Sequence, residues 1–344
     1  MCFIHFVPKR IIYKYLFLTR FIMENLTKVI FVGISILLLL FIALIIFRPF
    51  EDYRNNLSTE HGFIMDLSDY DFVLDQNGTT RYYKAHVPAN YNKNNPTPLV
   101  FAFSGRMGSE YVKENYNFVE KSDKEGFIVV FPRGASKKGG DRWVSWNAGK
   151  CCSYAAESNI DDVGFVRMML KDIKNKFNID KNRIYATGMS NGARFSYRLA
   201  CEMSDTFAAI APVSGVKSTI SCNPSNSISI LHIHSTEDTI APFNGGIGEG
   251  QNGVDYGSVA DTINWWVENN KCDNNPERIF ENNLSYCDSY NNYENEGEVR
   301  LCVTTDGGHS WPGVKESRFS LSPSSEAFDA TDMIWEFFKK HSKK

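Results

Sequence analysis

Short apolar runs of strand length alternate with helix-like periods along most of this chain. Such runs are found at residues 98–103, 127–131, 208–213 and 228–234. Residues 160–177 instead carry apolar side chains spaced three and four apart, which forms one face of a helix. Strands that alternate with helices of this length indicate βαβ units, and therefore an α/β fold with a mostly parallel central sheet and helices on both faces.

The same pattern predicts the remaining elements. Asn77-Gly78 is a strong turn signal between two strand-like segments, so a hairpin is expected at residues 71–74 and 81–87. Further strands are predicted at residues 183–187 and 299–304, and further helices at residues 110–124, 192–203, 259–269 and 325–341.

Residues 29–47 form a different pattern, an apolar run without charge or proline that only Gly33 and Ser35 interrupt. A helix of this length, rising about 1.5 Å per residue, would span a hydrocarbon core of about 30 Å. Basic residues outnumber the single acid in residues 1–28, so the N-terminus is expected in the cytoplasm. We predict a basic cytoplasmic segment at 1–28, a transmembrane anchor at 29–47, a stalk at 48–66 and one extracytoplasmic domain at 67–344.

A cleaved signal peptide that starts at Met23 is the alternative for this run, and it would make the domain a secreted one. The run is longer than the usual apolar region of a signal peptide, which has about 7–15 residues. It also ends in Phe47-Arg48-Pro49-Phe50 rather than at a small-residue cleavage site. An uncleaved anchor is therefore favoured.

Composition and cysteine usage narrow the function classes. The chain is 43% apolar and 22% charged, with a formal net charge of −3, which is ordinary for a globular protein and gives no support to nucleic-acid binding. Of the eight cysteines, all but Cys2 follow the apolar run, and none has the paired CxxC spacing of a zinc site. Disulfides in an oxidising compartment are expected, with one cysteine left over, and no metal or cofactor.

A candidate nucleophile is Ser190, in the sequence Gly188-Met189-Ser190-Asn191-Gly192. This G-x-S-x-G pattern is weak alone, but here a predicted strand precedes it and a predicted helix follows it. That is the setting in which a serine occupies a sharp strand-to-helix turn and becomes a nucleophile.

A serine hydroxyl needs a base, and the base needs an orienting acid. His309 follows the predicted strand at 299–304 through a glycine turn, whereas His232 and His234 lie within a strand, where one of them would be an ordinary strand residue. Asp238 lies between Ser190 and His309, as the hydrolase order requires; its neighbour Glu237 is the competing choice. Two earlier acids are better explained as helix caps, Asp161 and Asp162.

An oxyanion hole would use two backbone N–H groups. One belongs to Asn191, directly after the nucleophile. The other is expected from Arg106, in the loop that follows the strand at 98–103.

Several blocks of this sequence together resemble the secreted esterases that include polyhydroxybutyrate depolymerases and feruloyl and acetylxylan esterases. The blocks occur in family order and are 104–109 (SGRMGS), 145–152 (SWNAGKCC), 161–165 (DDVGF), 187–193 (TGMSNGA), 232–238 (HIHSTED) and 307–313 (GGHSWPG). The resemblance implies an α/β-hydrolase fold with Ser190, Asp238 and His309 as the triad. This sequence differs from the family at two positions: it has Ser104 where the family usually has His, and Ser235 where the family usually has Gly.

The resemblance also suggests finer features of the site. Trp146 and Trp311 would form pocket walls, with ordinary core packing as the alternative. A disulfide between Cys272 and Cys287 is implied by the family, whereas Cys151, Cys152, Cys201 and Cys222 can pair in three ways.

The predicted function is a serine esterase that acts through an acyl-enzyme on a polyester or an acylated polysaccharide. Two alternatives remain at this stage. One is a catalytically silent binding or adhesion ectodomain on a hydrolase scaffold. The other is a serine peptidase, which the same triad would serve.

Overall fold

The computed structural model describes residues 68–249, 255–294, 297–314 and 322–343. The predicted basic segment, transmembrane anchor and stalk, at 1–28, 29–47 and 48–66, lie outside the described residues. Within the described ranges, none of the helices has both the length and the apolar character needed to cross a membrane. Residues 67–344 form one compact unit.

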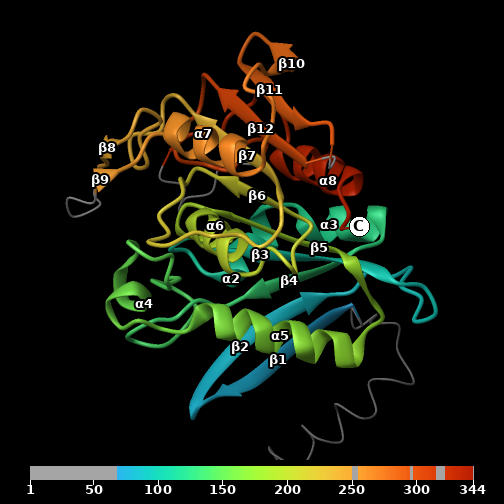
Figure 1. Cartoon of the computed structure of the whole chain (residues 1–344). Coiled ribbons are helices and arrows are strands. Elements are labelled where there is room, and N and C mark those ends of the chain that lie inside the picture. Colours follow the sequence, from blue (N-terminus) through green and yellow to red (C-terminus); the bar gives the residue numbers. More distant parts are fainter. Residues whose placement is uncertain (1–67, 250–254, 295–296, 315–321, 344) are drawn as a thin grey trace, which may run out of the picture. The chain divides into compact units, whose positions relative to one another are not determined.

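A sheet of 10 strands runs through this unit in the order β1-β2-β4-β3-β5-β6-β7-β12-β11-β10 (Figure 1). The central strands from β4 to β12 pair in parallel, and the strands at both edges pair antiparallel. The strands are β1 (Asp69–Gln76), β2 (Thr79–His86), β3 (Thr97–Phe103), β4 (Ile128–Pro132), β5 (Ile179–Met189), β6 (Ala209–Val213), β7 (Ser229–Ser235), β10 (Glu277–Asn282), β11 (Ser285–Asn292) and β12 (Gly297–Thr304).

Helices cover both faces of this sheet, which confirms the predicted α/β architecture. One hydrophobic cluster joins the sheet to α5, α6 and α7, and a second joins it to α2, α3 and α8. The helices are α2 (Ser109–Asn115), α3 (Phe118–Glu125), α4 (Ser153–Glu157), α5 (Asp162–Lys176), α6 (Asn191–Glu202), α7 (Val259–Asn269) and α8 (Ala330–Lys340). A small separate ribbon consists of β8 (Gly246–Ile247) and β9 (Asp255–Tyr256).

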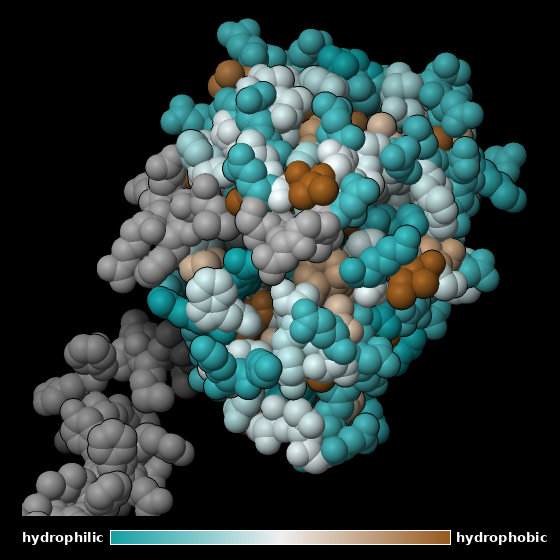
Figure 2. Space-filling model, turned by 90° about the vertical axis from the view of Figure 1, so that its left-hand side faces the viewer, coloured by the Kyte–Doolittle hydropathy of each residue, from teal (hydrophilic) through white to brown (hydrophobic). Residues whose placement is uncertain are grey.

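Strand β3 shows why a continuous apolar run forms a central strand. Leu99, Phe101 and Phe103 pack in the first cluster, whereas Val100 and Ala102 pack in the second. Successive side chains of a strand point to opposite faces, so a strand that is covered on both sides is apolar at most of its positions. The outer surface differs: Figure 2 shows a mostly hydrophilic face on which hydrophobic residues are scattered singly.

Two predicted helices differ from the structure, and one hairpin was not predicted. The helix expected at 110–124 is divided into α2 and α3, because Asn117 adopts a left-handed conformation with φ of 55°. The closing helix begins only at Ala330, where the Asp329 side chain accepts a hydrogen bond from the Asp332 N–H. The hairpin β10–β11 is not predicted by periodicity, since every residue of β10 is exposed and its apolar residues do not alternate with polar ones.

The disulfides require a correction. Cys287 pairs with Cys302, not with Cys272, which is a buried free cysteine. Cys287 and Cys302 are direct partners in the antiparallel register of β11 and β12, with Cα atoms 4.1 Å apart, so the strand pairing brings them together. The other two bridges are Cys201–Cys222 and Cys151–Cys152.

The two acids expected to cap a helix have different roles. Asp161 is the N-cap of α5 and accepts a hydrogen bond from the Gly164 N–H at 2.8 Å. Asp162 is fully buried, pairs with the Arg81 guanidinium at 2.7 Å and accepts the Asn147 N–H at 2.8 Å. The helix-cap prediction is thus confirmed for Asp161 and wrong for Asp162, which joins β2 to the loop before α4.

These roles predict unequal losses of stability. Asp161→Ala removes one cap and should lower the free energy of unfolding by about 1 kcal/mol. Asp162→Ala leaves the buried Arg81 charge unpaired and should lower it by about 3–5 kcal/mol. Denaturant unfolding of the two variants beside wild type measures both values. Equal losses would contradict the structural role assigned to Asp162, and an added Arg81→Met substitution should restore part of its loss.

Candidate active site

The sequence around Ser190 forms a sharp turn between β5 and α6. Ser190 has φ of 58° and ψ of −116°, a backbone conformation that side-chain-bearing residues rarely adopt. Glycines on both sides allow it, because a Cβ on Gly188 would lie 2.5 Å from the Phe103 carbonyl oxygen and a Cβ on Gly192 would lie 2.3 Å from the same atom. The G-x-S-x-G spacing is therefore required by backbone packing against the end of β3.

Parallel pairing brings the three candidate catalytic residues to one edge of the sheet. Ser190 directly follows β5, Asp238 follows β7, and His309 follows β12. All three strands belong to the parallel part of the sheet, so their carboxyl ends share one edge. Ser190 and His309 are 119 positions apart in the sequence, and the parallel pairing nevertheless brings them to one site.

Asp238 and His309 form a buried hydrogen bond. His309 Nδ1 lies 2.8 Å from Asp238 Oδ2, and the two residues are 5% and 3% exposed. Burial acts to raise the pKa of Asp238, but hydrogen bonds from His234 and His309 outweigh it and hold that pKa well below its usual value. The carboxylate is therefore ionised at neutral pH, and Glu237, the competing acid, is exposed.

A second set of contacts fixes the other side of Asp238. Its Oδ1 accepts the N–H groups of Ile240 and Ala241, at 3.0 and 2.7 Å. His234 Nε2 lies 3.3 Å from Oδ2 and 2.7 Å from the Ala241 carbonyl oxygen. Both carboxylate oxygens are thus held by groups other than His309, which keeps Asp238 in one orientation.

A chain of buried side chains continues inward from His234. His234 Nδ1 lies 3.0 Å from His232 Nε2, and His232 Nδ1 lies 2.7 Å from the Tyr197 hydroxyl. Burial, followed by the neighbouring His234, lowers the pKa of His232 well below its usual value, so His232 is neutral. All four contacts can be hydrogen bonds that run in one direction. Tyr197 then donates to His232 Nδ1, His232 Nε2 donates to His234 Nδ1, and His234 Nε2 donates to Asp238 Oδ2 and to the Ala241 carbonyl oxygen. Both ring nitrogens of each strand histidine thus have hydrogen-bond partners, and His234 helps to hold Asp238 in place.

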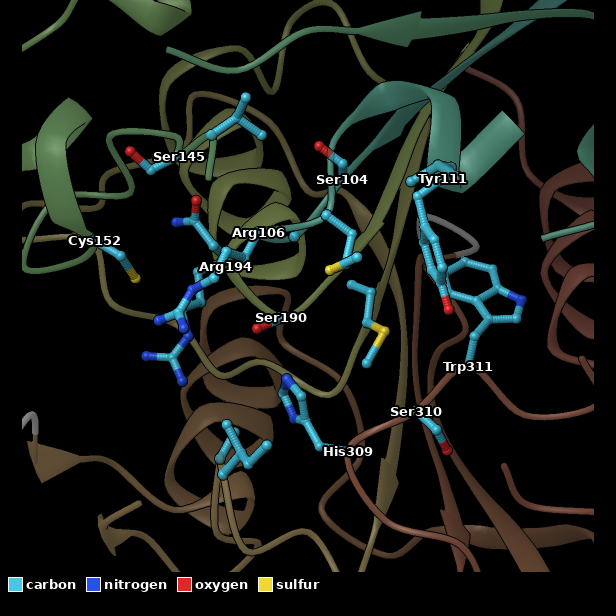
Figure 3. A pocket seen from close by; sticks show the side chains of 18 of the residues that line it. Ser104, Arg106, Tyr111, Ser145, Cys152, Ser190, Arg194, His309, Ser310 and Trp311 are labelled. Atoms are coloured by element: carbon cyan, nitrogen blue, oxygen red, sulfur yellow. The ribbon is translucent and has the colours of Figure 1, made fainter. Parts of the chain in front are cut away.

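Ser190 and His309 line one cavity (Figure 3). Arg106, Asn191 and Trp311 also line it. The loop that carries Arg106 lies against the nucleophile, because a Cβ on Gly105 would be 3.4 Å from Ser190 Cβ and 4.0 Å from Ser190 Oγ. Ser104, at the position where the related esterases usually have His, is buried in the same loop, and its Oγ has no hydrogen-bond partner among the described residues.

The two tryptophans occupy different places. Trp311 lines the cavity and stacks on Tyr116 with ring centroids 4.3 Å apart. Trp146 is fully buried and does not line the cavity, which corrects the expectation of a pocket wall. Its indole N–H donates to the Ser104 carbonyl oxygen at 2.9 Å, and its backbone exchanges two hydrogen bonds with the Asn191 side chain. Trp146 therefore holds Ser104 and Asn191, two residues that do line the cavity, in place.

Arg194 and Tyr256 are among the cavity residues that were not predicted from the sequence. Arg194 lies on α6, four residues after Ser190, and the i, i+4 spacing of a helix would have indicated that it lies on the same side as the nucleophile. Tyr256 comes from the short strand β9, for which the sequence gives no periodic signal. The residues that the structure describes contain no group of three or more His, Cys, Asp or Glu side chains suited to a metal ion.

Comparisons with known proteins agree on one class. Residues 97–248 match the family model described as esterase PHB depolymerase. The chain is 30% identical to feruloyl esterase B of Piromyces equi over 253 residues, which cover 68% of this chain and 44% of that protein. It is 27% identical to the bifunctional acetylxylan esterase/xylanase XynS20E of Neocallimastix patriciarum over 169 residues, covering 49% of this chain and 23% of that protein. The chain thus spans less than half the length of either relative.

Solved structures show the same fold. The acetyl xylan esterase from Aspergillus awamori superposes with a TM-score of 0.54 at 16% identity, over 79% of this chain and 99% of that one. A thermostable esterase superposes with a TM-score of 0.50 at 16% identity, over 81% of this chain and 64% of that one. At these identities the similarity concerns the architecture, which agrees with the sheet order and the two helical layers described above.

Proposed function

Because residues 97–248 belong to the esterase PHB depolymerase family, we propose that this chain is a serine carboxylic ester hydrolase that acts through an acyl-enzyme. The observation that carries the proposal is the buried His309–Asp238 hydrogen bond beside a cavity that His309 shares with Ser190. A serine, a histidine and an oriented carboxylate supply the nucleophile, the base and the acid that ester cleavage requires.

In the proposed reaction, Ser190 Oγ attacks the ester carbonyl carbon while His309 Nε2 takes its proton. The N–H groups of Asn191 and Arg106 would hold the oxyanion of the tetrahedral intermediate. His309 then gives the proton to the departing alcohol oxygen, and the acyl group remains on Ser190. Water, deprotonated by His309, then adds to the acyl carbon, the bond to Ser190 Oγ breaks, and His309 returns the proton to Oγ as the carboxylic acid leaves. Asp238 holds the imidazole through Nδ1 and stabilises its charged form.

A fluorophosphonate probe tests the proposal without knowledge of the substrate. Such probes react with activated serines, so the full chain should be labelled at Ser190 and the label should be located there by peptide mass analysis. Absence of labelling would favour the silent binding ectodomain. Comparing the hydrolysis of short esters with that of peptides separates an esterase from a serine peptidase.

For the substrate we propose an ester of the kind that the relatives' names describe, a feruloyl or acetyl ester of a polysaccharide, or a hydroxyalkanoate polyester. Tyr111 and Trp311, which lie together on one side of the cavity in Figure 3, support binding of an apolar or aromatic group. A hydrolysis panel of feruloyl sugars, acetylated xylan and hydroxybutyrate oligomers distinguishes these classes.

We further propose that residues 29–47 anchor the domain outside the cytoplasm, as the length and composition of this run suggest. The full chain should remain in the membrane fraction after an alkaline carbonate wash. Leu38→Arg combined with Leu40→Arg adds an insertion penalty of about 5–7 kcal/mol and should abolish this retention. Leu57→Arg, outside the run, is the matched control. A carbonate-soluble wild-type chain would contradict the anchor.

A further inference from the structure

A buried arginine beside Ser190 has no acidic partner among the residues that the structure describes. Arg194 is 3% exposed, and no carboxylate of the described residues lies within 4.0 Å of its guanidinium nitrogens. Burial lowers the pKa of Arg194 to about 10, so the side chain is still charged at neutral pH. A buried charge is usually paired, because an unpaired charge in the interior destabilises the folded protein. An unpaired arginine at the wall of a cavity therefore points to an acidic group on the substrate as its partner.

The neighbours of Arg194 leave its N–H groups available. Its Cζ lies 3.6 Å from the centroid of the Tyr256 ring, and its guanidinium N–H groups donate no hydrogen bond to another described residue. Asp238 attracts Arg194 over a longer distance, but the Asp238 oxygens already accept hydrogen bonds from His309, His234 and two backbone N–H groups. The Asp238 carboxylate is therefore committed to the candidate triad.

A second arginine acts on the same part of the cavity. Arg106 also lines it, and both arginines lower the pKa of Tyr256, against the larger raising effect of burial. No Asp or Glu is among the described residues that line the cavity. Figure 3 shows Arg106 and Arg194 on one side of Ser190, and Tyr111 and Trp311 on the other. The two arginines, with the Tyr256 and Trp143 rings against them, thus lie on one side of the nucleophile, and Tyr111 and Trp311 lie on the other.

We propose that Arg194, assisted by Arg106, forms a carboxylate-binding subsite, so that the preferred substrates are esters with a free carboxylate near the scissile bond. This inference rests on the proposed ester hydrolysis and names the substrate class of the same site. Arginine suits this task because its planar donors bind both oxygens of a carboxylate, and the buried position limits screening by salt. The carboxylate would belong either to the acyl group or to the alcohol.

Two matched pairs of substrates test the proposal and separate these sources. For the acyl side, the p-nitrophenyl monoester of glutaric acid is compared with p-nitrophenyl pentanoate. For the alcohol side, 4-acetoxybenzoate is compared with its methyl ester. We expect wild-type kcat/KM to favour the anionic member of at least one pair by about tenfold or more. Ratios at or below one in both pairs would overturn the proposal without any variant being made.

Variants assign the effect to Arg194. Arg194→Met should lower kcat/KM for the anionic ester at least about tenfold more than for its neutral partner. Arg194→Lys retains the charge and should keep part of the preference. Arg167→Met, on the exposed side of α5, is the control and should leave the ratio unchanged. An anionic preference that persists in Arg194→Met would overturn the role of this residue.

Two measurements keep the outcomes distinct. Thermal unfolding shows whether each variant is folded, and the wild-type ratios remain decisive if Arg194→Met is not. Fluorophosphonate labelling of Ser190 reports the proposed ester hydrolase independently of substrate charge. Labelling together with equal rates for anionic and neutral esters would overturn only the carboxylate subsite. Absence of labelling and of hydrolysis of all four esters would overturn the proposed function, and this subsite with it.

Discussion

Replacing Ser190 with Ala should lower kcat for a short p-nitrophenyl ester by at least about 10³-fold. The alanine has no oxygen to attack the carbonyl carbon, so no acyl-enzyme forms. The cavity, the neighbouring N–H groups and His309 would remain, and they leave only the residual hydrolysis that binding and oxyanion stabilisation provide. Steady-state kinetics measure the loss, and a stopped-flow experiment should show that the burst of p-nitrophenol disappears.

The matched control for this experiment is Ser136→Ala. Ser136 lies in a loop and does not line the cavity, and its hydroxyl donates only to the Gly139 carbonyl oxygen. This variant should retain wild-type kcat. A folded Ser190→Ala variant with wild-type activity would show that another residue is the nucleophile.

Replacing Asp238 with Asn should have a similarly large effect, a decrease in kcat of about 10³- to 10⁴-fold. Oδ1 accepts two backbone N–H groups, from Ile240 and Ala241, so the amide oxygen of the new side chain must take that position. The amide NH₂ then replaces Oδ2 and faces His309 Nδ1 and His234 Nε2. It can only donate, so His309 must accept at Nδ1 and carry its proton on Nε2, where it cannot serve as base to Ser190.

The adjacent acid provides the control for this variant. Glu237→Gln changes the same charge one residue away, on an exposed side chain, and should leave kcat within about twofold of wild type, as a surface substitution. Fluorophosphonate labelling should be much slower in Asp238→Asn and unaffected in Glu237→Gln. If Glu237→Gln were the impaired variant, the assignment of the acid would be reversed. Since the pKa of Asp238 lies below 3.8, its protonation should not shape the pH–rate profile above that value.

Much of the central sheet could be predicted because local sequence and burial agree there. The apolar run that became β3 is buried on both faces, and α7 begins and ends at its predicted residues. The α7 boundary is determined locally, since Ser258 and Asp261 form a capping box. Strand β10 is the opposite case: it is held by pairing with β11 rather than by burial, so its sequence carries no period.

The sequence by itself determined the order of the strands and helices of the central sheet and the positions of Ser190, Asp238 and His309 after three of those strands. These are local matters, because turn residues, caps and apolar periods act over a few positions. Only the tertiary structure decided which distant groups meet: Cys287 with Cys302, Trp146 with Ser104, and Arg194 with no acid among the described residues. Strand register and long-range packing select those neighbours, and a free charge at a cavity wall is recognisable only when its whole surroundings are known.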